Sequence, residues 1–209
     1  MPTIEYFYSA HSAFAYLGHA RLVEIAKTAG ATLIHRPIEL GPVVGAAHPN
    51  GFGKRSLAHT NYYFGREIER WAEHCSVAFK GGIPDNHRNG TVLANSLLIA
   101  ATAQDHGAND LALEIMRSHW QDHADLAIKP HLLGLCEAIN LDGPALMAAA
   151  QSPEVAEILQ KNTNEAIERS VFGSPTYFVG GDMFYGQDRL EFVARALKQP
   201  FRNDWPKKD

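Results

Sequence analysis

The N-terminal part of the chain carries two strand patterns with a helical pattern between them. Residues 3–8 and 31–36 are short apolar and aromatic runs with polar neighbours, which predict two strands. Between them, one helical face is formed by Phe14, Gly18, Leu22 and Ile25. Ser12 stands where this helix should begin and Gly30 where it should end, as helix caps do. This order predicts a βαβ unit with parallel strands and a right-handed crossover.

The middle of the chain has helical periodicity and no strand pattern. Glycine, proline and asparagine are frequent in residues 41–53, which predicts a loop. The helices expected after this loop cover residues 57–74, 89–106, 109–122, 130–139 and 142–150. A further helix should begin at Ser152, because a capping serine, a proline and an acidic residue follow one another there. The apolar side of that helix is expected to carry Val155, Ile158, Leu159, Ala166 and Ile167.

The strand pattern returns near the C-terminus. Residues 176–179 are β-branched and aromatic, which predicts a strand. Residues 180–182 are two glycines and an aspartate, which tolerate the positive φ of a tight hairpin. Residues 183–185 then return as a second strand, and a last helix is expected over 188–198. Strands therefore cluster at both ends of the chain, and helices fill the middle.

Composition and charge exclude several classes of protein. The 209 residues are 45% hydrophobic and 20% charged, enough for one good core that could divide into two lobes. A net charge of −4 gives no reason to expect nucleic acid or an anionic membrane as partner. No apolar run has the length of a transmembrane helix. The N-terminal MPTIEYFYSA lacks the basic and apolar regions of a signal peptide.

The two cysteines favour a reducing compartment. Cys75 and Cys136 are far apart in the sequence and belong to no C-x-x-C motif. Neither a disulfide framework nor a zinc ribbon is therefore expected. Together with the missing signal peptide, this predicts a cytoplasmic protein.

Motifs along nearly the whole chain resemble one known group of proteins. The C-terminal part has G-x-P-T-[FY]-F-V at 173–179, then a hairpin and G-Q-D-R-L at 186–190. Further blocks are S-x-F-x-Y-L-G at 12–18, R-P-x-x-L-G-P at 36–42 and a helical block at 119–127. These motifs resemble the group of DsbA and the kappa-class glutathione transferases, and within it the 2-hydroxychromene-2-carboxylate isomerases. The resemblance implies an α/β fold, a thioredoxin-like domain with an all-helical insertion.

The resemblance also implies a division of the chain. Residues 1–50 and 152–209 would form the thioredoxin-like domain, and residues 51–151 the helical insertion. The two halves of the sheet must then meet in space. This would place the helix start at Ser12 beside Ser174 and Pro175, where we expect the functional site.

The resemblance implies that Ser12 is a catalytic residue. A thioredoxin-type oxidoreductase has C-x-x-C at this helix start, but Ser12 and Ala15 occupy those positions, which excludes dithiol exchange there. Taken alone, such a serine is a helix cap. In the isomerases and the kappa-class transferases, a serine here hydrogen-bonds the sulfur of glutathione and favours the thiolate, assisted by the helix dipole. The resemblance therefore implies glutathione as the cofactor and Ser12 as a catalytic residue.

Further contacts with glutathione are implied near the C-terminus. A cis bond between Ser174 and Pro175 would turn backbone groups of Ser174 towards a peptide-like ligand. Asp188 and Glu191 have the spacing of a capping box, which gives Asp188 a structural explanation. A helix start with a carboxylate beside it also suits the γ-glutamyl end of glutathione. The family binds that end with the residues that correspond to Gln187 and Asp188.

The expected substrate contacts depart from the family pattern. The isomerases commonly carry a lysine for the substrate's carboxylate after L-G-P, where this chain has residues 43–45, Val-Val-Gly. Asn50, Lys54 and Arg55 follow shortly and could take over this role. Four aromatic residues expected around the site favour a planar apolar substrate, although core packing explains most of them equally well: Phe14, Tyr62, Tyr63 and Phe64.

Other candidate residues have simpler explanations. Asn162 falls on the apolar side of its helix and is expected to be a buried, hydrogen-bonded residue. His119 and His123 have the i, i+4 spacing of zinc ligands but lack the glutamate of H-E-x-x-H, so no metal site is expected. His11 could tune a thiolate beside Ser12, but an exposed loop residue is the simpler interpretation.

These expectations describe a glutathione-dependent isomerase of the 2-hydroxychromene-2-carboxylate isomerase type, which acts on a conjugated aromatic substrate through reversible thiolate addition. Two alternatives stay open. One is a kappa-class-like glutathione transferase or peroxidase. The other is a non-enzymatic thioredoxin-fold binding module, which would tolerate change at Ser12. The expected partners are glutathione and a small aromatic substrate, and the family implies a homodimer.

Overall fold

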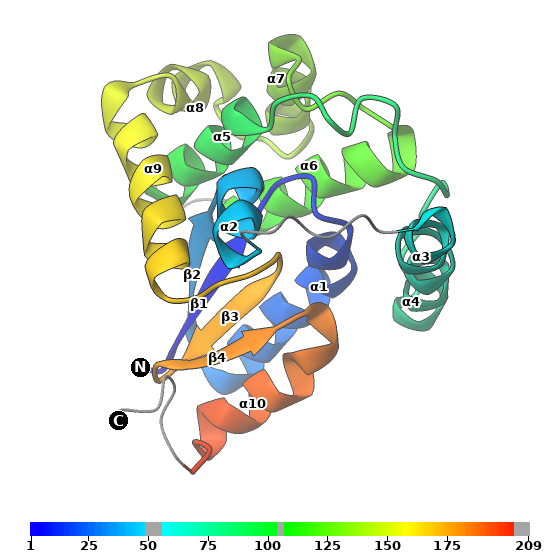
Figure 1. Cartoon of the computed structure of the whole chain (residues 1–209). Coiled ribbons are helices and arrows are strands. Elements are labelled where there is room, and N and C mark those ends of the chain that lie inside the picture. The colour runs from blue at the N-terminus through cyan, green and yellow to red at the C-terminus, as the bar shows by residue number, and fades with distance from the viewer. Residues whose placement is uncertain (49–55, 104–106, 203–209) are drawn as a thin grey trace.

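A four-stranded sheet joins the two ends of the chain (Figure 1). The computed structural model describes residues 1–48, 56–103 and 107–202. The strands are β1 (Thr3–Tyr8), β2 (Thr32–Pro37), β3 (Thr176–Val179) and β4 (Asp182–Tyr185). Their order is β2-β1-β3-β4, with β1 parallel to β2 and antiparallel to β3. Glu5 of β1 therefore has Ile34 opposite it on one side and Phe178 on the other.

The predicted βαβ unit and hairpin are confirmed. Helix α1 (Ala13–Ala29) connects β1 to β2, and Ser12 is its N-cap. Gly30 ends the helix at φ 59°, a left-handed conformation that costs glycine little. The turn between β3 and β4 is formed by Gly180 and Gly181, both at positive φ.

Helices cover both faces of the sheet (Figure 1), and alternate residues of β1 pack against one helical layer or the other. On one face, Ile4, Tyr6 and Tyr8 pack in a common core with residues of α1 and of α10 (Leu190–Lys198). On the other face, Phe7 and Phe178 pack with residues of α2 (Leu40–Ala47) and α9 (Pro153–Glu168). The period of two along β1 thus fixes which side chains enter each layer.

The remaining helices lie between α2 and α9 in the sequence. They are α3 (Leu57–Asn61), a π-helical turn (Tyr62–Arg66), α4 (Glu67–Cys75), α5 (Val92–Ala103), α6 (Ala108–Asp122), α7 (Lys129–Ala138) and α8 (Gly143–Ala150). In the described part of the chain, none of the helices is long and apolar enough to cross a membrane.

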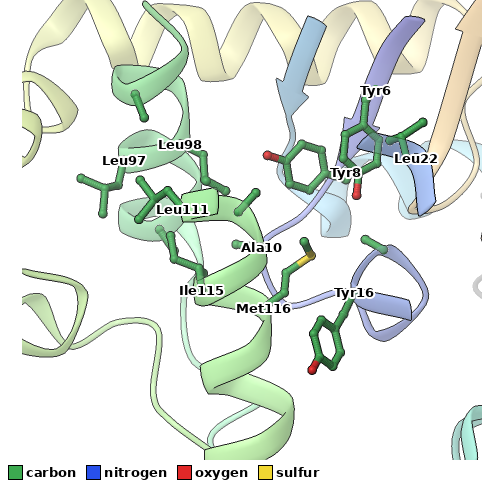
Figure 2. Close-up of a cluster of buried hydrophobic side chains, with 14 of the residues drawn as sticks. Tyr6, Tyr8, Ala10, Tyr16, Leu22, Leu97, Leu98, Leu111, Ile115 and Met116 are labelled. Atoms are coloured by element: carbon green, nitrogen blue, oxygen red, sulfur yellow. The ribbon is translucent and has the colours of Figure 1, made fainter. Parts of the chain in front are cut away.

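One hydrophobic core runs from the sheet into these helices (Figure 2). Tyr6 and Tyr8 of β1 belong to the same buried cluster as Leu98 of α5 and Leu111 and Met116 of α6. The core therefore continues across the boundary expected between the thioredoxin-like and the helical parts. The assignment of residues 51–151 to a separate domain stays a prediction.

The predicted loop at 41–53 is wrong for its first half, because residues 40–47 form α2. Pro42 stands in the first turn of this helix, where its missing N–H costs no hydrogen bond. Val43 is fully buried in the cluster of the second sheet face. Burial of this apolar side chain thus outweighs the low helix propensity of the local glycine and proline.

Two smaller predictions near α9 and α10 are also wrong. Ile158 was expected on the apolar side of α9 but is 40% exposed. The capping box of Asp188 and Glu191 does not form, because a 3₁₀ turn over Gln187–Arg189 precedes α10. Asp188 pairs with the neighbouring Arg189, and Glu191 pairs with Arg21 of α1 at 3.2 Å.

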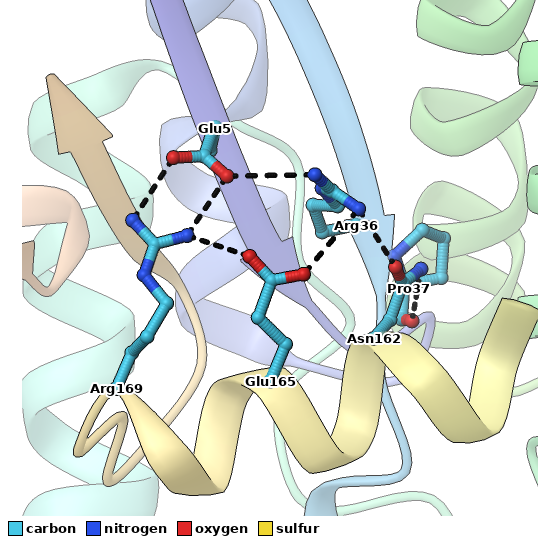
Figure 3. Close-up of polar contacts among 6 residues, drawn as sticks. All are labelled: Glu5, Arg36, Pro37, Asn162, Glu165 and Arg169. Carbon is cyan, nitrogen blue, oxygen red and sulfur yellow. Dashed lines mark hydrogen bonds and ion pairs between the residues drawn. The ribbon is translucent and has the colours of Figure 1, made fainter. Parts of the chain in front are cut away.

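A network of charged side chains fixes α9 to the sheet (Figure 3). Arg169, just after α9, donates to both carboxylate oxygens of Glu5 at 2.8 and 2.9 Å and to Glu165 at 2.9 Å. Arg36 of β2 lies 3.6 Å from each of the same two carboxylates. Asn162 is buried, donates to the Pro37 carbonyl and accepts from Arg36. The structural interpretation of Asn162 is therefore confirmed.

Candidate functional site

Ser12 and Ser174 come from opposite ends of the chain and meet through a hydrogen bond. The Ser12 hydroxyl donates to the carbonyl oxygen of Ser174 at 3.1 Å. Its oxygen accepts the N–H of Ala15 at 3.2 Å, which caps α1. Ser174 is held from a second side, because its Oγ accepts the N–H of Ser9 at 3.1 Å. The sheet thus brings the two predicted site residues together.

The segment around Pro175 packs tightly against β4. The Ser174–Pro175 bond is cis, as expected. The Pro175 carbonyl accepts the N–H of Gly186 at 2.9 Å. Gly173 has no room for a side chain, because a Cβ there would lie 2.5 Å from the ring of Tyr185. These contacts fix the backbone on either side of Ser174.

Unpaired backbone donors surround this junction. In the described part of the chain, the N–H groups of Ala13, Phe14 and Ser174 have no hydrogen-bond partner. Ala13 and Phe14 are the first two residues of α1, where the helix dipole adds partial positive charge. The junction is therefore suited to an anionic group such as a thiolate or a carboxylate.

An apolar cleft of about 260 Å³ opens on one side of Ser174. Its wall includes the predicted Phe14, Tyr63 and Phe64. Tyr62, expected with them, does not line it: this residue is 52% exposed and accepts a hydrogen bond from Arg70. Further apolar lining comes from Leu40, Val44, Ile83, Trp120 and Phe172. Such a wall suits a flat apolar ligand.

A second cleft of about 270 Å³ adjoins the first and is more polar. The two share the residues Phe14, Tyr63, Ser174 and Tyr185. Its lining also includes Glu67, Gln187, Asp188 and Arg189, so the second cleft contains both predicted γ-glutamyl contacts and charged side chains of both signs.

Gln187 is a buried polar residue of this second cleft whose side chain lacks a hydrogen-bond partner in the described chain. It is only 3% exposed, yet its amide has no hydrogen-bond partner among the residues that the structure describes. The amide atoms are not among the polar atoms sealed from solvent, and the residue lines the cleft, so the amide can be reached from it. Gln187 is therefore poised for a polar ligand group or an ordered water molecule.

The close approach of α1 holds Gln187 in place. A Cβ on Gly18 would lie 2.7 Å from Cβ of Gln187 and 3.3 Å from Cδ1 of Leu190. Only a glycine at this position lets the 3₁₀ turn lie so near the helix. Gly18 was predicted as part of the buried helix face, and this contact gives it a role in shaping the site.

Histidines form a part of the apolar cleft that the sequence did not reveal. His11 was expected to be an exposed loop residue, but it is largely buried and lines the cleft together with His87. Burial and the neighbouring His87 and His119 lower the pKa of His11 to about 3. Burial, with smaller contributions from His119 and Arg88, lowers the pKa of His87 to about 4. Both rings are therefore neutral at physiological pH.

None of the three predicted substrate contacts can be placed. Asn50, Lys54 and Arg55 lie outside the described residues. Cys75 and Cys136 are free thiols and line neither cleft. Among the residues that the structure describes, no group of three metal-ligating side chains is arranged so that it could hold a metal ion.

The fold and the site together define a thioredoxin-like protein with a serine where the dithiol would stand. A family model described as "DSBA-like thioredoxin domain" matches residues 3–198. The chain therefore belongs to the DsbA-like thioredoxin family.

Relatives that match nearly the whole chain include isomerases and a kappa-class glutathione transferase. The chain is 28% identical to 2-hydroxychromene-2-carboxylate isomerase from Sphingobium xenophagum, over 93% of this chain and 97% of the relative. A solved structure of 2-hydroxychromene-2-carboxylate isomerase superimposes with a TM-score of 0.79 at 25% identity, over 94% of this chain and 95% of the other. Glutathione S-transferase kappa 2 from Caenorhabditis elegans is 21% identical over 95% of this chain and 93% of the relative. The resemblance found in the sequence is thus confirmed.

Proposed function

We propose that this protein is a glutathione-dependent isomerase of the 2-hydroxychromene-2-carboxylate isomerase type, acting on a conjugated aromatic substrate. The observation that carries the proposal is the junction of a polar and an apolar cleft at Ser174, beside the helix start at Ser12. Relatives named for this isomerase match nearly the whole chain. We infer that glutathione takes the polar cleft and the aromatic substrate the apolar one.

The residues of the polar cleft fit glutathione. The Gln187 amide can both donate and accept, and it lacks a protein partner in the described chain. Asp188 can hold the ammonium group of the γ-glutamyl end, and Arg189 its carboxylate. The unpaired N–H of Ser174 can donate to a peptide carbonyl of the ligand.

Glutathione, when bound, would supply a thiolate that adds reversibly to the conjugated substrate. The part of this chain is to keep the sulfur ionised and to orient the ring. The free N–H groups of Ala13 and Phe14 and the dipole of α1 favour negative charge at the junction. The Ser12 hydroxyl, which now donates to Ser174, can rotate to donate to sulfur instead. An aromatic ring bound against the apolar wall would exclude water from the junction and so strengthen these interactions.

A kappa-class-like glutathione transferase is the second candidate, because the Caenorhabditis elegans relative matches over nearly the full length of both chains. Both functions need the same glutathione site. They differ in the outcome for the substrate, which is released as an isomer in one case and stays conjugated in the other.

The test combines binding and turnover. Calorimetry should show one glutathione site per chain, and no binding at about 10 mM, roughly −2.7 kcal/mol, would overturn both functions. With glutathione bound, 2-hydroxychromene-2-carboxylate should convert to trans-o-hydroxybenzylidenepyruvate, followed by its ultraviolet spectrum. No conversion, together with a stable glutathione conjugate of a halonitrobenzene, would favour the transferase over the isomerase.

A further inference from the structure

Three histidines from distant parts of the chain meet beside the apolar cleft: His11 and His87 line it, and His119 lies behind His87. His11 precedes α1, His87 lies between α4 and α5, and His119 belongs to α6. The rings of His11 and His87 meet edge to face, with their centroids 4.8 Å apart. Nδ1 of His87 is 2.9 Å from Nε2 of His119, and Nδ1 of His119 is 2.9 Å from the carbonyl oxygen of Ala124.

This chain of hydrogen bonds fixes the tautomer of both rings. The Ala124 carbonyl can only accept, so Nδ1 of His119 must carry a hydrogen. Nε2 of a neutral His119 is then bare, and it can only accept from Nδ1 of His87. Burial lowers the pKa of both rings and keeps them neutral. The remaining nitrogen of His87, Nε2, is therefore left with a lone pair and no hydrogen.

That nitrogen is open to a ligand. In the part of the chain that the structure describes, Nε2 of His87 has no hydrogen-bond partner, and it is not among the buried polar atoms sealed from solvent. His87 lines the apolar cleft, where its ring lies against Trp120 with centroids 5.2 Å apart. The cleft thus contains an acceptor in a largely apolar wall.

We propose that Nε2 of His87 accepts a hydrogen bond from a hydroxyl group of an aromatic ligand in the apolar cleft, and that His119 is a positioning residue that fixes this tautomer. The inference rests on the proposed function for the assignment of this cleft to the substrate. It deepens that function by assigning recognition of the substrate's hydroxyl group to His87.

The bare Nε2 of His87 favours the end of a substrate that carries a hydroxyl group. A bare imidazole nitrogen attracts an O–H or N–H donor and repels a carboxylate or an ether oxygen, which have only lone pairs to offer. A carboxylate of the same substrate must therefore point away from His87. The titratable and charged groups that act on the two rings are His11, Arg88, His123 and Asp125.

The tautomer can be measured without any ligand. Long-range ¹H–¹⁵N correlation spectra of histidine-labelled protein at neutral pH should show His87 as a neutral ring protonated at Nδ1. In His119→Leu, which removes the acceptor behind it, the His87 signals should move towards a mixture of tautomers. A His87 that is charged or protonated at Nε2 in the unmodified protein would overturn the proposal.

The hydroxyl preference is tested with two probes of similar shape, 2-naphthol and 2-methoxynaphthalene, whose binding is followed by calorimetry. The protein should bind 2-naphthol about threefold to tenfold more tightly, which corresponds to one neutral hydrogen bond. His87→Phe keeps a flat ring but lacks the acceptor, so the preference should vanish. His74→Phe, an exposed histidine of α4 outside both clefts, is the matched control and should keep the preference.

Each outcome decides the question. Equal affinity of the two probes, no binding of either, or a preference that survives in His87→Phe would each overturn the proposal. These measurements need no glutathione and no turnover. Failure to bind glutathione would therefore overturn the proposed function while leaving the hydroxyl preference measurable, and the two failures can be told apart.

Discussion

The Ser12 hydroxyl gives its single proton to the carbonyl oxygen of Ser174, 3.1 Å away, and accepts the N–H of Ala15. The first bond ties the start of α1 to the residue before the cis proline, and the second caps the helix. Ser12 therefore stabilises the fold in the absence of any ligand. A catalytic role must be separated experimentally from this structural one.

Replacing Ser12 by Ala should reduce turnover far more than glutathione affinity. A hydrogen bond to a charged group contributes roughly 1.5–3 kcal/mol, so we expect about a tenfold to hundredfold loss of turnover. The pKa of the bound glutathione thiol should rise, because the hydroxyl no longer favours the thiolate. Steady-state kinetics and thiolate absorbance measure the two effects.

The matched control for Ser12→Ala is Ser152→Ala. Ser152 caps α9 in the same way, accepting the N–H of Val155 at 3.3 Å, but lines neither cleft. Both variants should lose about 1 kcal/mol of unfolding free energy through the lost cap. Ser12→Ala should lose about 1 kcal/mol more, because the Ser174 carbonyl also loses its hydrogen-bond donor. Only Ser12→Ala should lose activity, and full activity in that variant would mean that Ser12 is a helix cap alone.

Gln187→Leu should weaken glutathione binding without harming the fold. The amide is buried and has no partner in the described chain, so its removal breaks no protein hydrogen bond. Losing one or two bonds to the ligand should lower affinity about threefold to thirtyfold by calorimetry. Gln160→Leu on the exposed side of α9 is the control. Unchanged affinity in Gln187→Leu would place glutathione elsewhere.

Much of the fold could be predicted because its signals are local. The β-branched run at 176–179, the Gly180-Gly181 turn and the caps Ser12 and Gly30 each act within a few residues. Helix α2 was missed because it depends on burial of Val43 against a distant part of the chain. Local glycine and proline content pointed to a loop, and the tertiary contact outweighs it.

The site residues, too, divide into those that local motifs predict and those that depend on tertiary contacts. Ser12, Ser174 and Gln187 stand in motifs that a sequence can reveal, and all three line the two clefts. His87 belongs to no motif and stands in an irregular segment. Its tautomer depends on His119, 32 positions later, and on a backbone carbonyl beyond that. Such a relay exists only in the folded chain, and periodicity cannot predict it.

Acid should destabilise the protein between about pH 6.5 and pH 4. Burial lowers the pKa of His19 from 6.5 to about 4, and burial also lowers that of His35. Between the unfolded and the folded pKa, these histidines are protonated in the unfolded chain but stay neutral in the folded chain. The free energy of unfolding therefore falls as the pH falls. Above about pH 6.5 the effect is absent. His19 alone should account for roughly 3 kcal/mol.

Urea unfolding at a series of pH values measures this effect. His19→Gln can keep a donor towards the Asn109 carbonyl, which lies 2.9 Å from Nε2 of His19, but cannot titrate. It should flatten the pH dependence, whereas His74→Gln on the exposed side of α4 should not. An equal slope in the His19 variant and the unmodified protein would show that other groups cause the acid sensitivity.

Gly18→Ala should disturb the site from inside helix α1. Alanine is favoured over glycine in a helix by about 1 kcal/mol, but the added Cβ would lie 2.7 Å from Cβ of Gln187. Overpacking of this kind costs about 1–3 kcal/mol, so we expect a net loss of stability or a displaced 3₁₀ turn. In either case glutathione affinity should fall, because Gln187 must move.

Gly134→Ala is the control for Gly18→Ala, because it changes helix propensity without introducing a steric clash. Gly134 lies inside α7, and nothing is within 4 Å of a Cβ built there. This variant should gain up to about 1 kcal/mol of unfolding free energy and bind glutathione as before. Urea unfolding and calorimetry compare the pair. If Gly18→Ala gains as much stability as Gly134→Ala and keeps its affinity, close approach of α1 does not hold Gln187 in place.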